Sequence, residues 1–548
     1  MAFLSTLLAS SERVYRWLVK IHPKDFRAEH ESEMVQNFRD LCRERLAHLS
    51  LTRMMQLWGY TFLDLAASAA IEHTRRRRPM STLDQDLRWD LRYGIQMFCK
   101  HSLWFLKYSA LTLFVGIVVV VLGVWSWSGV RIWQIEKPVQ DAWQQMTGKP
   151  PEAYFQAMLL QFPKSSMNES ARQLEDLTAR LGIFNPIPNR LYGGERKGAI
   201  GPFATVDVPH WVLSHLRKPN DDLDEAPAEL RQYLQSHRVD LDALYALVER
   251  GDIPRWETDL SQLVRAPVPQ LFYHRQLQGV IALDILEKTR KGESGSALRA
   301  LESSWKINES LRARTELISQ MVAISILKLQ AESIRKMESV PVEWQQRLNV
   351  KAWQQSFFRA MQLDAAVISR YLTHTNHPIK GAGWFSPFVN GPLGKPLRYL
   401  AGIESLELSG EVLSLIQRTD FCSLSPDTAL KQVEGSISSW NLGTQFGATN
   451  YLRGWRRSTE GLVTAELTHK ILQVKAARDS AKNKDWARNL APMQSSLCPE
   501  AKWVHEVAPN GTIQIQCRNL PEWLRNEHPT STPLTYSLEP ASQRRTPL

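Results

Sequence analysis

Cysteine is scarce in this chain: among 548 residues there are five, namely Cys42, Cys99, Cys422, Cys498 and Cys517. None of them forms a CxxC pair and no spacing is typical of a zinc site, so the sequence excludes a disulfide-rich scaffold. If the C-terminal part lies in an oxidising compartment, Cys498 and Cys517 are candidates for a disulfide, because a hairpin-like stretch separates them. Two buried free thiols are the alternative.

The motifs of common enzyme classes are also missing. The sequence has no HExxH, no Walker loop GxxxxGK[ST] and no GxGxxG after a strand, and GESGS at residues 292–296 lacks the spacing of a GxSxG elbow. His374 and His377 form an isolated HxxH without a partnered carboxylate, which gives little support for a metal site. We therefore predict no catalytic residue, no cofactor and no metal, and the chain is predicted not to be an enzyme.

Charge of one sign is not concentrated in any large region. The 67 basic and 56 acidic residues leave a net charge of +11, and the excess is spread along the chain. A nucleic-acid-binding protein usually gathers its basic residues on one face or helix. We therefore expect no nucleic-acid partner, and the one dense basic run, RRRR at residues 75–78, fits a position beside a membrane.

Long hydrophobic runs are few, and one reaches membrane-spanning length. Residues 108–130, YSALTLFVGIVVVVLGVWSWSGV, contain no charged side chain. As a helix this run spans about 35 Å, which exceeds the roughly 30 Å of a hydrocarbon core. Aromatic rings near the ends of such a helix favour the headgroup region. The predicted membrane anchors of this kind are Trp104, Tyr108, Trp125 and Trp127.

The basic residues on either side of this run predict its orientation. Before it stand Arg88, Arg92, Lys100 and Lys107, and after it stand Arg131, Lys137 and Lys149. Because the more basic flank stays in the cytoplasm, the N-terminal side is predicted to be cytoplasmic. The expected organisation is a cytoplasmic helical domain over residues 1–107, one transmembrane helix over 108–130, an extracytoplasmic domain over 131–540 and a disordered tail over 541–548.

The N-terminal part carries a family resemblance. Residues 22–41, HPKDFRAEHESEMVQNFRDL, have a helical apolar stripe that includes Met34, Val35 and Phe38. This stretch resembles a helix of the permease prefix domain, which precedes the core of bacterial MacB/FtsX-like ABC transporter permeases. Residues 83–113 are similar to the run that leads into their first membrane helix. The resemblance implies a protein of the bacterial inner membrane. Those permeases continue with three further membrane helices that have no counterpart here, so transport is not implied.

The large domain after the membrane run is predicted to be mainly helical. Pro151 begins one helix, while Asn168 caps a second that Gly182 ends. Wide apolar helical faces follow between residues 239 and 373, without a 34-residue repeat. TIQIQC and LTYSL near the C-terminus alternate as strands do and predict a small β-hairpin. Residues 162–183 and 465–478 are similar to bacterial membrane-anchored proteins whose extracytoplasmic helical domain has no assigned activity.

Two segments of the large domain are candidate sites. The acidic run of Asp221, Asp222, Asp224 and Glu225 lacks the ligand alternation of a calcium loop and is predicted to be a solvated loop or a helix N-terminus. A loop rich in glycine and proline over residues 374–396 is a candidate peptide or lipid groove. Its residues of interest are His374, His377, Trp384, Phe385 and Phe388. Plugging of the helical core by the aromatic residues is the alternative.

Three functions remain open on this evidence. The leading hypothesis is a single-pass inner-membrane protein whose external helical domain binds another membrane or envelope protein, as an accessory to a transporter or envelope complex. The alternative is a transmembrane signalling or regulatory protein. An envelope hydrolase with an unrecognised site is the third. A polar cleft with convergent carboxylates or histidines favours an enzyme, whereas an apolar groove favours binding.

Overall fold

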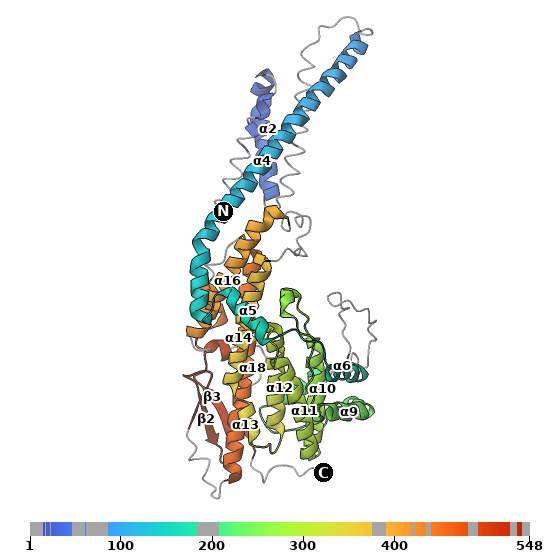
Figure 1. The fold of residues 1–548 in the computed structure, drawn as a ribbon, viewed down its shortest axis with the longest axis vertical. Helices are drawn as coiled ribbons and strands as arrows, with labels where there is room; N and C mark the ends of the chain where they lie inside the picture. The colour runs from blue at the N-terminus through green and yellow to red at the C-terminus, as the bar shows by residue number, and fades with distance from the viewer. Residues whose placement is uncertain are drawn as a thin grey trace. The chain divides into compact units, whose positions relative to one another are not determined.

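The computed structural model describes residues 12, 15, 16, 18–21, 24–46, 61, 86–183, 208–374, 391–418, 422–433, 440–480, 492–525 and 534–539. The chain divides into two compact units, Met1–Gly116 and Ile117–Leu548. The described residues are mainly helical and end in a small antiparallel sheet (Figure 1). The predicted fold class is confirmed at this level, while the predicted tail over 541–548 lies outside the described residues.

The first unit contains η1 (Val19–Ile21) and α2 (Lys24–Leu46). The rings of Tyr15 and Phe38 stack with their centroids 4.1 Å apart, and Val35 and Cys42 are buried beside them. This confirms that the helix 22–41 has an apolar stripe. Burial raises the pKa of the Cys42 thiol to about 11, so it is an unreactive packing residue.

A single helix, α4 (Asp86–Thr147), contains the predicted membrane run and continues well past it. Val119, Val120 and Leu122 are about 60% exposed, at 62%, 63% and 58%. From Ile135 onward one face of the helix is buried in the second unit, at positions that include Val139 and Trp143. The spacing of these three residues, four apart, is that of one helical face.

Two helices of the described chain are long and apolar enough to cross a membrane. The stretch Val118–Thr147 of α4 is 11% buried over its most apolar window, whereas α12 (Leu317–Lys336) is 61% buried. Gln320 and Gln330 of α12 are buried and donate hydrogen bonds to Arg312 and Ser304 of the preceding helix region. Polar groups paired in this way are typical of a helix in a protein core.

The remaining helices of the second unit follow in chain order. They are α5 (Pro151–Gln161), α6 (Glu169–Arg180), α7 (Val208–Leu216), α8 (Ala228–Ser236), α9 (Arg238–Glu249), η3 (Leu260–Arg265), α10 (Leu271–Arg290), α11 (Ser294–Arg312), α13 (Glu343–Arg347), α14 (Val350–His374), η5 (Pro392–Gly394), α16 (Lys395–Arg418), α17 (Pro426–Val433), α18 (Leu442–Ser480) and α19 (Glu522–Arg525). The predicted caps of α6 are confirmed, because the Asn168 side chain accepts from Ala171 N and Gly182 has a φ of +75°.

The core of this unit forms where long helices pack side by side. Helix α12 packs against α10, α11, α14 and α18, and α14 also packs along α16 (Figure 1). Trp353 on α14 and Trp455 on α18 are almost fully buried in this core. The apolar faces predicted between residues 239 and 373 are therefore covered by helices on more than one side, as expected from their width.

Gly402 lies where α16 packs closely against α14, and we predict a strong effect of adding one methyl group there. A Cβ at Gly402 meets Thr373 Cγ2 at 2.6 Å and the Ser369 carbonyl oxygen at 2.9 Å. Gly402→Ala is expected to lower the free energy of unfolding by about 1–3 kcal/mol through overpacking. Gly410 on the same helix has nothing within 4 Å of an added Cβ, so Gly410→Ala is the control and is expected to be neutral or slightly stabilising. Thermal unfolding followed by circular dichroism measures both, and equal melting temperatures would count against the close contact.

The C-terminal sheet has four antiparallel strands in the order β1-β2-β3-β4. The strands are β1 (Met493–Gln494), β2 (Lys502–Val507), β3 (Ile513–Arg518) and β4 (Thr535–Leu538). The predicted pairing of TIQIQC with LTYSL is confirmed, since Ile515 of β3 faces Tyr536 of β4. Two strands were not predicted, and the pairing of Trp503 with Cys517 places β2 beside β3.

The candidate disulfide between Cys498 and Cys517 does not form, and the alternative of two free thiols is also wrong for Cys498. Cys498 forms a disulfide with Cys422, and Cys517 is a half-buried thiol that is not part of a disulfide. Cys498 lies in the turn between β1 and β2, whereas Cys517 lies within β3, opposite Trp503. The turn after α16 meets the sheet region here, because the indole of Trp523 donates to the Cys422 carbonyl oxygen over 2.8 Å. The disulfide therefore joins the sheet to the helical core.

Candidate functional site

A strongly charged cleft of about 710 Å³ lies among α8, α9, α10 and α11. Its basic lining residues are Arg231, Arg238, Lys288, Arg290, Lys291 and Arg299. Its acidic lining residues are Asp242, Asp284, Glu287 and Glu293. Six basic and four acidic side chains give the lining a net formal charge of +2. The sequence analysis did not single out any of these residues.

Asp284 on α10 is a buried carboxylate of the cleft, with a side chain that is 4% exposed. Arg238 donates to its Oδ1 over 2.9 Å and the Tyr245 hydroxyl donates to its Oδ2 over 2.7 Å. The ammonium of Lys288, one turn further along the helix, lies 2.7 Å from Oδ2 and 4.9 Å from the centre of the Tyr245 ring. Because an unpaired charge is costly away from water, these three partners are what allow the carboxylate to be buried.

Arg238 and Asp242 hold each other in their ionised forms. The hydrogen bond with Asp242 and the charge of Asp284 raise the pKa of Arg238, and Arg238 in turn lowers the pKa of Asp242. Burial, together with the charge of Asp284, raises the pKa of Tyr245. General acid–base catalysis needs a group that titrates near the working pH. The cleft is polar and contains four carboxylates, which is the arrangement named above as favouring an enzyme, while the ionised pair of Arg238 and Asp242 suits the binding of charged groups.

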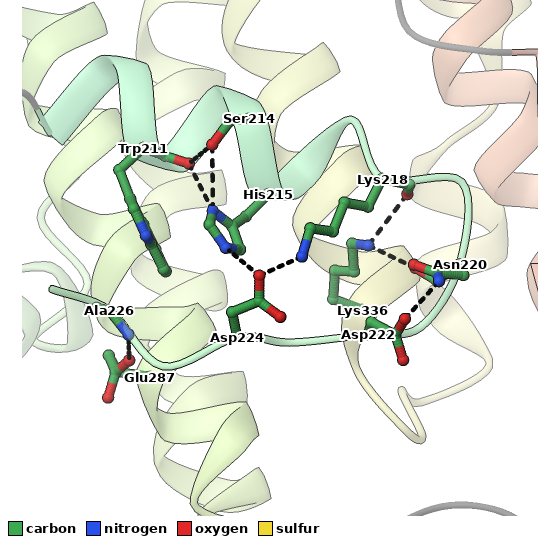
Figure 2. Close-up of polar contacts among 10 residues, drawn as sticks. All are labelled: Trp211, Ser214, His215, Lys218, Asn220, Asp222, Asp224, Ala226, Glu287 and Lys336. Atoms are coloured by element: carbon green, nitrogen blue, oxygen red, sulfur yellow. Dashed lines mark hydrogen bonds and ion pairs between the residues drawn. The ribbon is translucent and has the colours of Figure 1, made fainter.

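The acidic segment, defined as residues 220–226, contacts residues that line this cleft. Ala226 N donates to Glu287 Oε1 over 3.0 Å, as Figure 2 shows. Glu225 lies 2.7 Å from Arg231 and 3.9 Å from Arg290, both of which line the cleft. The segment contains no helix or strand, so the prediction of a loop is confirmed, but its side chains are paired with the protein rather than only solvated.

Asp224 joins the acidic segment to the end of α7. In Figure 2 His215 and Lys218 both point toward its carboxylate: His215 Nε2 lies 3.0 Å from Oδ2, and Lys218 Nζ contacts the same oxygen. Hydrogen bonds with these two partners, of which the one with Lys218 contributes most, lower the pKa of Asp224. The ring of His215 also stacks on that of Trp211, with 4.0 Å between centroids.

Ser214, His215 and Asp224 have the residue types of a hydrolase triad but not its geometry. Ser214 Oγ donates to the Trp211 carbonyl oxygen over 2.7 Å, and His215 Nδ1 lies 2.9 Å from the same oxygen (Figure 2). Ser214 Oγ also lies 3.2 Å from His215 Nδ1, but its hydrogen is directed at the Trp211 carbonyl oxygen and is not presented to the histidine. A triad requires the histidine to act as the base that takes this hydrogen. This group is therefore a structural contact, and it gives no support to an envelope hydrolase.

Lys336 at the end of α12 contacts the backbone where the acidic segment begins. Its side chain is 4% exposed, and its ammonium donates to the carbonyl oxygens of Lys218 and Asn220, the first over 3.1 Å (Figure 2). Burial, with a smaller contribution from the neighbouring Arg335, lowers the pKa of Lys336 to about 7. Because this amine titrates near neutral pH, the stability of the folded chain is expected to depend on pH.

We predict that Lys336 makes stability rise with pH above neutrality. An unfolded lysine keeps its proton to about pH 10.4, whereas the folded group releases it near pH 7. Between these values the unfolded chain binds more protons, so stability is expected to rise by up to about 1.4 kcal/mol per pH unit. Unfolding of the full chain in detergent at pH 7, 8 and 9, with Lys336→Met as comparison, measures this slope. If Lys336→Met keeps the whole slope, another group is responsible.

The sequence-predicted site residues are only partly described. His374 is the last residue of α14, and its Nδ1 lies 2.6 Å from the Thr373 hydroxyl. The other residues of the predicted binding loop, which are His377, Trp384, Phe385 and Phe388, lie outside the described residues. The groove hypothesis and the HxxH hypothesis therefore stay hypotheses. Among the described residues no group of three or more metal-ligating side chains gathers.

The predicted membrane anchors all lie on α4. Trp125 and Trp127 are 40% and 47% exposed, while for Trp104 and Tyr108 the structure describes the backbone alone. No protein family, curated protein or solved structure matches this chain. The resemblances to the permease prefix domain and to membrane-anchored helical proteins stay predictions. Function has to be inferred from the residues themselves.

Proposed function

We propose that this chain is a single-pass protein of the bacterial inner membrane whose external helical domain binds a partner protein through the charged cleft. The observation that carries the proposal is the change of surface along α4. Its apolar residues around Val119 and Val120 are exposed, whereas Ile135, Val139 and Trp143 are packed into the helical domain. Over one stretch this helix is apolar on all sides, and over the next it is apolar on one face. This change is typical of a membrane anchor that continues into a soluble domain.

The Cys422–Cys498 disulfide supports an extracytoplasmic position for the large domain. Disulfides persist in oxidising compartments and are rare in the cytoplasm. The bond belongs to the domain after α4, so it agrees with the orientation predicted from the basic residues before the membrane run. Reporter fusions test this. Phosphatase activity is expected after residue 150 and not before Trp104, and a fusion after residue 150 that is active as a cytoplasmic reporter contradicts the orientation.

The cleft supports a protein partner that carries charged groups of both signs. Arg299 at its edge is 40% exposed and pairs with Glu249, and Lys291 lies in the turn beside it. Exposed charges of this kind set the rate and specificity of association more than its strength. Within this proposal the partner is a transporter or an envelope complex. A transmembrane signalling role is the second candidate, which the continuity of α4 between the two units favours.

Co-purification of the full chain from solubilised membranes tests the binding role. The partner is expected to co-purify in stoichiometric amount and to be released by salt. Lys291→Glu combined with Arg299→Glu is expected to abolish this co-purification. Arg172→Glu combined with Arg518→Glu changes the net charge equally at exposed sites outside the cleft lining and serves as the control. A permease or ATPase as partner supports an accessory role, and a transcriptional regulator supports signalling. Equal recovery with both variant pairs contradicts a role for the cleft.

A further inference from the structure

Trp440 lies against the apolar part of α4. Its ring meets that of Trp127 edge to face, with 5.7 Å between centroids and 83° between planes. Trp127 belongs to the uncharged run that we propose to cross the membrane, whereas Trp440 directly precedes α18 in the large domain. Both rings remain part-exposed, at 47% and 38%. A residue of the large domain therefore contacts the anchor helix within its uncharged run.

The large domain covers one face of α4 at this same level. Ser128 is fully buried, while its neighbours Trp127 and Gly129 are exposed. The first charged residue after the run is Arg131, four positions beyond Trp127. At about 1.5 Å per residue, Trp127 lies roughly 6 Å to the membrane side of Arg131. The contact with Trp440 therefore falls at the depth of the headgroup region rather than in the water beyond it.

Polar contacts just outside this level fix the position of Trp440. The side-chain amide of the next residue, Asn441, donates to Glu404 Oε2 over 3.1 Å, and Arg131 lies 4.0 Å from the other oxygen of that carboxylate. Asn441 and Glu404 are buried, at 5% and 3% exposure. Tyr399, one and a half turns before Glu404 on α16, donates to Glu136 of α4 over 2.6 Å. The segment that carries Trp440 is thus held to both α4 and α16.

We propose that Trp440 enters the lipid headgroup region beside Trp127 and gives the large domain a second contact with the bilayer. Tryptophan favours this region because its apolar ring and its N–H group are both accommodated there. The contact adds to the anchorage by α4, and it holds the domain against the membrane surface. The inference rests on the proposed membrane role of α4, and lipid is the occupant because the tryptophan pair continues the exposed apolar surface of that helix.

Spin-label accessibility in lipid nanodiscs of phosphatidylethanolamine and phosphatidylglycerol tests the proposal on the full chain. Cys42, Cys99 and Cys517 are replaced with serine, which leaves the disulfide intact. Labels are then placed by Trp440→Cys, by Val120→Cys on the anchor helix and by Val239→Cys on α9, where the side chain is 81% exposed. The ratio of collision with oxygen to collision with a nickel chelate at position 440 is expected to shift from the value at 239 toward that at 120.

The outcomes separate this inference from the proposed function. A water-like ratio at 440 with a lipid-like ratio at 120 overturns the second contact and leaves the anchor. A water-like ratio at 120 overturns the anchor itself. Shielding of position 440 from both reagents indicates protein contact and also overturns the inference. A photo-reactive phenylalanine derivative at 440 keeps an aromatic ring there and gives an independent readout: lipid adducts support the contact, and adducts with protein alone contradict it.

Discussion

Replacing Cys422 and Cys498 together with serine is expected to lower the free energy of unfolding by about 4 kcal/mol. The bond joins residues 76 positions apart, and a cross-link over a loop of this length removes much conformational entropy from the unfolded chain. Both residues are buried, at 2% and 3% exposure, so each serine also buries a hydroxyl that needs a partner. Chemical denaturation of the full chain in detergent, followed by circular dichroism, measures the loss.

Cys517→Ser is the matched control for the disulfide. This thiol is half-buried and not part of a disulfide, so the substitution is expected to change the free energy of unfolding by less than about 1 kcal/mol. Addition of a reductant is expected to bring the wild-type chain close to the double serine variant and to leave that variant unchanged. Equal stability of the double serine variant and Cys517→Ser would contradict a stabilising role of the bond.

Asp284→Ala is expected to lower the free energy of unfolding by about 3–5 kcal/mol. The substitution leaves the buried ammonium of Lys288 without its carboxylate, and it removes the acceptor of the Tyr245 hydroxyl. Arg238 loses one of its two carboxylate partners as well. Breaking one side of a buried ion pair costs more than the pair contributes, because an uncompensated charge stays behind.

Asp242→Ala is the control for Asp284→Ala, because it removes a carboxylate of the same charge that is not buried. Asp242 pairs with the same arginine, but its side chain is 46% exposed, so water replaces the lost contact. The expected loss is below about 1 kcal/mol. Thermal unfolding of both variants at two salt concentrations measures the difference. A loss of similar size in the two variants would mean that the Asp284 contacts contribute no more than a surface pair.

Local signals in the sequence predicted the helices that have clear ends. Asn168 and Gly182 act through hydrogen bonds and backbone angles within a few residues, so their roles can be predicted from the local sequence. Strand β2, KWVHEV, escaped prediction because its two valines are not buried and Trp503 alone is enclosed, which leaves no clear alternation. The neighbouring TIQIQC, which forms β3, alternates apolar and polar residues, so its strand was predicted.

The disulfide and the cleft could not be predicted, because they depend on residues that meet only in the folded chain. Cys422 and Cys498 have no shared motif, and their pairing follows from the place where the turn after α16 meets the sheet. The pairs Arg238–Asp242 and Asp284–Lys288 have the i,i+4 spacing of ordinary surface helices. Nothing in that spacing indicates that one carboxylate is buried and the other exposed.

The acidic segment has a consequence for how the domain is completed during synthesis. The Tyr536 hydroxyl donates to Asp221 over 2.8 Å, and Ser537 N donates to the Pro219 carbonyl oxygen over 2.7 Å. The first of these pairs is separated by 315 positions. A ribosome that adds about 5–20 residues per second delivers the later partners many seconds after the earlier ones. During that interval the carboxylate of Asp221 and the turn beside it lack these two hydrogen bonds of the finished domain.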